Sequence, residues 1–219
     1  MDAYPFLLLG HLLLLVFWLG TDIGVFLAAR ISERDDLGVE ARVTVLGLGM
    51  VLDRLPRSCL VLIIPSGFLL AQNSGLLALE PVWHVAMWLL AAAWLALLWT
   101  GFLTKDQALQ GRCMLANLVL NGLMALAAGL GSWWMWAAEQ APAWLALKLS
   151  AVAAIFAAGV WLDVQFRPAV AAFGEIATGG ATSELNDRYR KAIAPVYLSV
   201  LTIYALVLVA SGLGVFKPG

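Results

Sequence analysis

The chain has 219 residues, of which 63% are hydrophobic and only 12% charged, a composition typical of a polytopic membrane protein rather than a soluble domain. A net charge of -1 provides no basic field for nucleic acid. Cys59 and Cys113 are isolated, so no CxxC motif exists and both are expected to pack as small hydrophobic residues. The first apolar run is long and lacks a basic leader, so we do not expect it to be a cleaved signal.

Six apolar segments are long enough to cross about 30 Å of hydrocarbon. We expect one all-α membrane domain over residues 1–219, with spans at about 5–29, 57–73, 81–103, 113–137, 142–166 and 192–215. The stretch Val43–Leu52 is too short to span and is expected to extend the second helix or lie at the interface. Gly179-Gly180 interrupts the polar insert 167–191, where Thr182 or Ser183 is expected to cap the last helix.

The orientation follows from the uneven distribution of lysine and arginine. The first, third and fifth loops and the start of the second helix are basic, whereas the second and fourth loops carry neither residue. This bias predicts that both termini lie outside and that the basic loops lie in the cytoplasm of a bacterial cell, with the protein in the inner membrane. An outer aromatic belt is predicted from Trp83, Trp133, Trp134, Trp136 and Trp144.

Two histidines, His11 and His84, fall near the same predicted end of the first and third spans. Lys148 enters the fifth span from that side, and Met87 and Met135 lie at a similar level. Imidazole and ammonium groups inside a bilayer usually face a partner, a cavity or a cofactor. The sequence therefore predicts that these polar side chains, contributed by different helices, converge on one site.

Two facing neutral imidazoles are the usual axial ligands of a b-type heme, and helix bundles often hold cofactors between facing helices. Lys148 would then bind a propionate or the iron. Copper is the alternative, because histidine with methionine suits that metal. Without a cofactor, either histidine would form only a hydrogen bond to a neighbouring helix, and Lys148 would extend to the surface.

A second polar set is predicted deeper in the bundle. On the first helix His11, Trp18 and Asp22 lie near one face. A carboxylate at Asp22 must be paired or protonated, and its expected partners are Arg54, Arg57 or the pair Asn117 and Asn121. This set, with Asp53 and Asp163, is interpreted either as a proton path or substrate carboxylate site, or as polar contacts between helices.

The chain resembles the bacterial heme-containing protoporphyrinogen oxidase family (HemJ-type) and the related copper-resistance D-like membrane proteins. The resemblance rests on the His11, Trp18 and Gly20 pattern, on RLPRSCLVLIIPSG at 54–67, on WLALKLSAV at 144–152 and on VLVASGLGVFKP at 207–218. It implies a heme b site that involves His11, and a functional role for Lys148. Members of this family often carry another histidine near the end of the first helix, where this chain has 28–30 as Ala-Ala-Arg.

We therefore predict a heme b-binding membrane protein that acts in electron transfer or as a membrane oxidoreductase, with a redox partner or a quinone. The predicted metal ligands are His11 and His84, the other cofactor-binding residues are Lys148 and Trp18, and the predicted catalytic residues are Lys148 and Asp22. Three alternatives stay open: a protoporphyrinogen IX oxidase, a copper-handling protein, and a non-catalytic subunit of a larger membrane complex. A homo-oligomer is a further expected assembly.

Overall fold

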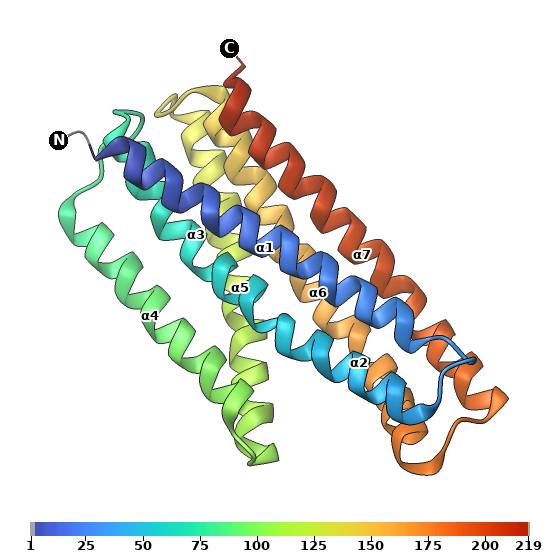
Figure 1. The fold of residues 1–219 in the computed structure, drawn as a ribbon. Helices are drawn as coiled ribbons and strands as arrows, with labels where there is room; N and C mark the ends of the chain where they lie inside the picture. Colours follow the sequence, from blue (N-terminus) through green and yellow to red (C-terminus); the bar gives the residue numbers. More distant parts are fainter. Residues whose placement is uncertain (1–2, 219) are drawn as a thin grey trace.

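The computed structural model describes residues 3–218, and within them it is entirely helical (Figure 1). The helices are α1 (Tyr4–Ser32), α2 (Val39–Leu52), α3 (Arg54–Asn73), α4 (Pro81–Leu103), α5 (Gln107–Ala137), α6 (Ala143–Gly179) and α7 (Ser183–Phe216). Helices are the element expected from such apolar segments, because inside a bilayer each backbone N–H and C=O must find its partner within the segment.

Six helical units are long and apolar enough to span a membrane, as the sequence predicts. One of them is formed by α2 and α3 together, which meet at Asp53. The expectation that the stretch Val43–Leu52 extends the second helix is therefore confirmed. The ends of α1 and α7 that carry the chain termini lie at the same end of the bundle (Figure 1). We call that end the termini side, and the opposite end, with loops 33–38, 104–106 and 180–182, the basic side.

The six spans pack in chain order as a closed ring. Each span contacts its neighbour along the chain, and α7 returns to contact α1. Among the described residues the backbone of α4 approaches only α3 and α5, so it lies on the far side of the ring from α7, although its Trp94 side chain also stacks on Phe156 of α6. At mid-depth the interior is filled by two apolar clusters, one around Trp94 and Phe156 and one around Trp18, Cys59 and Ile155. The ring is therefore closed in its middle and leaves space toward both ends.

Two helices extend much farther on the basic side than the sequence predicts. We expected spans ending at 166 and beginning at 192, with a polar insert between them, but α6 continues to Gly179 and α7 begins at Ser183. At about 1.5 Å per residue, the 37 residues of α6 measure about 55 Å, well beyond a bilayer core. Pro168 lies inside α6 without ending it. Thr182 caps α7 by accepting from the Leu185 N–H, as expected for this position.

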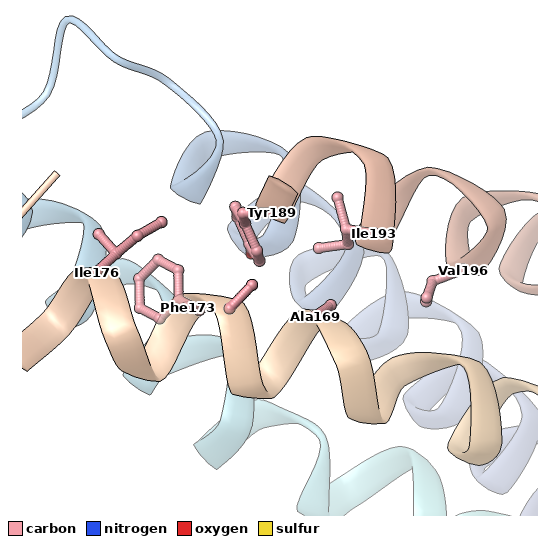
Figure 2. Packing of buried hydrophobic residues seen from close by; sticks show 7 residues of the cluster. Ala169, Phe173, Ile176, Tyr189, Ile193 and Val196 are labelled. Carbon is pink, nitrogen blue, oxygen red and sulfur yellow. The ribbon is translucent and has the colours of Figure 1, made fainter. Parts of the chain in front are cut away.

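The extension is a packed helical unit rather than a loop, because apolar residues recur every three or four positions and form one face on each of α6 and α7. Its core includes side chains with no exposed surface, and Figure 2 shows the α6 residues facing those of α7. The labelled members are Ala169, Phe173, Ile176, Tyr189, Ile193 and Val196. The chain therefore remains one helical unit, in which α1, α2, α6 and α7 continue together on the basic side.

A buried arginine joins this unit. Arg42 of α2 is only 1% exposed; its Nε donates to the Ser32 carbonyl at 2.7 Å, and Nη1 donates to the Asn186 side-chain oxygen at 2.9 Å. The Tyr189 hydroxyl lies 2.7 Å from the Ser32 hydroxyl. These contacts connect α1, α2 and α7 through side chains that are buried inside the protein.

Candidate functional site

A cavity of about 460 Å³ lies on the termini side, and we call it the histidine cavity. Its walls come from α1, α3, α5, α6 and α7, and no residue of α4 lines it. Most of the wall is apolar. The polar lining residues are Tyr4, His11, Ser74, Lys148, Ser211 and Lys217. A concave, mostly apolar space with a few polar groups is the usual form of a ligand site.

His11 enters this cavity in a fixed orientation. Its Nδ1 lies 3.0 Å from the Ser66 hydroxyl oxygen, and that hydroxyl donates its own hydrogen to the Ile63 carbonyl at 2.9 Å. Because the Ser66 hydrogen is used, Nδ1 must be the donor to Ser66. In the neutral ring, Nε2 then carries the lone pair. Nε2 makes no hydrogen bond within residues 3–218, so it remains available to a ligand in the cavity.

Gly67 on α3 provides the room for this ring. A Cβ at that position would lie 3.2 Å from His11 Cε1, closer than an ordinary van der Waals contact. The Ser66-Gly67 pair therefore sets both the direction and the depth of the imidazole. Sequence reasoning noted the segment that contains these two residues only as part of a resemblance, because spacing along one helix does not show which residue of another helix it meets.

Lys148 of α6 and His11 line the same cavity. Within the described chain the ammonium has no hydrogen bond or ion pair. A Cβ at Gly214 of α7 would lie 2.8 Å from Lys148 Nζ, so only glycine leaves this space. Lys217 lies at the same end, 5.9 Å above the ring of Trp144. Lys148 and Lys217 therefore both line one cavity, whereas the sequence indicated only Lys148.

His84 lies elsewhere. Its Nε2 is hydrogen-bonded to the Gln72 side-chain oxygen, and it does not line the histidine cavity. The predicted pairing of His11 with His84 is not formed, because no residue of α4 lines the cavity that His11 enters. Of the two methionines at this level, Met135 lines the cavity and Met87 does not.

Trp144 also differs from the prediction. It is 7% exposed and lines the histidine cavity, whereas the other four members of the predicted belt are strongly exposed. Those four are Trp83, Trp133, Trp134 and Trp136. The exposed belt therefore has four tryptophans rather than five, and Trp144 forms part of the cavity wall instead.

A second space, of about 170 Å³, lies toward the basic side; we call it the aspartate cavity. Trp18, Leu60 and Ile155 line both cavities and form the wall between them. Asp22 belongs to the aspartate cavity, so the two residues predicted to be catalytic, Lys148 and Asp22, lie in different spaces.

The aspartate cavity contains a connected set of charges. Arg57 donates through Nε to Asp53 at 2.7 Å, and through Nη1 and Nη2 to the two oxygens of Asp163 at 3.3 and 3.0 Å. This bidentate pair joins α3 to α6. Asn117 and Asn121 also line the cavity, but Asn117 accepts from the Trp94 indole at 2.9 Å.

Within residues 3–218 no group of three or more histidine, cysteine or acidic side chains is placed to hold a metal ion by itself. Cys59 and Cys113 are buried and unpaired, as predicted. Any metal in the histidine cavity would therefore need ligands beyond such a cluster, as an iron porphyrin supplies through its own four nitrogens.

No family model, curated protein or solved structure matches the chain.

Proposed function

We propose that the histidine cavity binds heme b, with His11 Nε2 as an axial ligand, and that the protein acts in electron transfer or as a membrane oxidoreductase. The observation that carries the proposal is the His11 Nδ1–Ser66 hydrogen bond of 3.0 Å. A histidine that binds a metal usually donates its other ring N–H to such a partner, which fixes the tautomer and the ring plane.

The lining fits a porphyrin in size and polarity. The volume of about 460 Å³ lies in the range of small-molecule and cofactor sites, which is about 300–1,000 Å³. The apolar residues from five helices suit the macrocycle. Lys148 and Lys217 are suited to the two carboxylates of its propionates, and both sit among the cavity residues.

When bound, heme supplies one-electron exchange at its iron. His11 would hold and orient the heme, and Lys148 would balance the charge of its propionates. The wall of Trp18, Leu60 and Ile155 would separate it from the basic side. Electrons would pass to a redox partner or a quinone within a bacterial inner membrane.

The test is to measure the absorption spectrum and the iron content of the detergent-purified protein, expressed in cells that are supplied with a heme precursor. The proposal predicts a Soret band with iron and porphyrin in equal amounts, and loss of both in His11→Ala. Protein with neither iron nor porphyrin would overturn it. Copper without porphyrin would support the copper-handling alternative, and co-purification with other membrane proteins, unaffected by His11→Ala, would support the structural-subunit alternative.

A second candidate is protoporphyrinogen IX oxidation. The observation in its favour is the pair Lys148 and Lys217, because a porphyrinogen carries the same propionates as heme. It predicts that the chain rescues a strain that lacks this oxidase and that Lys148→Ala abolishes the rescue. Failure of the intact protein to rescue, while it holds heme, would leave electron transfer as the function.

A further inference from the structure

The aspartate cavity is lined by more acidic than basic side chains, and these side chains have no role in the proposed heme site. Three carboxylates line it, those of Asp22, Asp53 and Asp163, and Arg57 is the single basic side chain in its lining. Arg57 is committed to the other two acids through Nε and both terminal nitrogens. Asp22 is therefore the carboxyl group without a cation.

Each partner expected for Asp22 is engaged elsewhere. Arg54 lies over the ring of Phe102, with its guanidinium carbon 5.9 Å from the ring centre. Asn117 accepts from the Trp94 indole. Asn121 donates to the Asn117 carbonyl at 2.8 Å. In the described chain no lysine, arginine or histidine nitrogen lies within 4.0 Å of the Asp22 carboxylate.

Acidic, basic and phenolic side chains of other helices face Asp22. From the α2–α3 unit they are Asp53 and Arg57, and from α6 Asp163. From α7 they are the phenols of Tyr197, which lines the cavity and donates to Glu33, and of Tyr204, whose hydroxyl lies near Asp22. The helices α4 and α5 contribute only uncharged lining residues. The Tyr204 hydroxyl is buried and makes no hydrogen bond of 3.5 Å or less within residues 3–218.

An ionised carboxylate without a cation is costly among apolar side chains, whereas the neutral acid is not. We propose that the aspartate cavity is a protonation site, in which Asp22 is a neutral carboxylic acid that exchanges one proton with water on the basic side. On uptake, an O–H bond forms at an Asp22 oxygen and a hydronium ion becomes water; on release, the reverse occurs. No electron moves in either direction.

The basic side is the side of access. The side chains of Arg57, Asp53 and Asp163 are 29%, 28% and 23% exposed, so the protein itself does not seal these ion pairs. Toward the termini side the wall is closed by Trp18, which is 9% exposed, with Leu60 and Ile155. The site is separate from the histidine cavity, and its protonation does not depend on heme.

Infrared spectroscopy tests the proposal directly, on the full chain in detergent or lipid vesicles near neutral pH. A protonated carboxyl gives a C=O stretching band well separated from carboxylate bands. We expect such a band in the native protein, a small shift of it in D₂O, its loss in Asp22→Asn and a displaced band in Asp22→Glu. Asp106→Asn is the matched control, because Asp106 is an exposed helix cap.

Two results would overturn the proposal. One is a native spectrum with no protonated carboxyl band at neutral pH. The other is a band that stays unchanged in Asp22→Asn. If Asp22→Asn fails to fold, the native chain is labelled with isotopes at its aspartates. The proposal then requires the protonated carboxyl band to shift in the labelled protein. A sodium or potassium ion at Asp22 would show instead as an ionised native carboxyl together with salt-dependent thermal stability.

Discussion

His11 of α1 and Ser66 of α3 are joined by a 3.0 Å hydrogen bond, although 55 residues separate them along the chain. The bond uses Nδ1 and leaves Nε2 toward the histidine cavity. Because α1 and α3 are neighbours in the ring, the packing of the two spans determines how the imidazole is presented.

Ser66→Ala removes this bond and leaves the helix otherwise unchanged. We expect heme to bind about 10–100-fold more weakly, since outer partners of a metal-bound histidine typically contribute that much affinity. Heme titration of the purified apoprotein measures the change. Ser74→Ala is the control, because Ser74 lines the cavity but bonds only to the Leu70 carbonyl. Equal affinities in both variants would contradict the role given to Ser66.

Gly214→Ala places a methyl group 2.8 Å from the Lys148 ammonium and forces that side chain to move. An alanine within a helix is otherwise favoured over glycine by about 1 kcal/mol. We therefore expect a protein that folds as well as the native one but retains less heme, as in Lys148→Ala. The heme content after purification is the measurement.

The control for that variant is Gly212→Ala. A Cβ there meets only Phe216, at 3.9 Å or more, so heme content is expected to be unchanged. Loss of heme in both glycine variants would show that the effect belongs to α7 in general and not to the space around Lys148.

Arg42→Ala removes the buried guanidinium that joins α1, α2 and α7. Leaving a buried acceptor without its donor typically costs about 1–3 kcal/mol, and Arg42→Ala leaves two, the Ser32 carbonyl and the Asn186 side-chain oxygen, so we expect a clear fall in thermal stability in detergent. Arg34→Ala is the matched control: Arg34 forms an exposed ion pair with Asp36, whose loss is expected to cost less than about 1 kcal/mol. Similar melting temperatures for the two variants would contradict the structural role of Arg42.

The spans were predictable because hydropathy and the need to satisfy the backbone act locally, residue by residue. The same local rules placed the end of the fifth span at 166, whereas α6 continues through Pro168. The part of the helix beyond this proline is held by the core of Phe173 and Tyr189, which only the folded chain brings together. The expected cap at Thr182 was correct because capping depends on neighbouring residues alone.

The candidate site was predicted only in part. Depth along each span correctly grouped His11 with Lys148, and both line one cavity. Depth also grouped His84 with them, and there it was wrong, because the level of a residue does not show which way its helix faces or which helices it contacts. Ser66 and Gly214 carried no visible signal, since a small residue in a span is usually a packing residue.

The most direct test of the central claim is the reduced-minus-oxidised absorption spectrum of the native protein beside His11→Ala and His84→Ala. The arrangement of the histidine cavity predicts a b-type spectrum that disappears in His11→Ala and persists in His84→Ala. A spectrum that is lost equally in both variants would contradict this account and restore the two-histidine site, and no spectrum in the native protein would remove heme altogether.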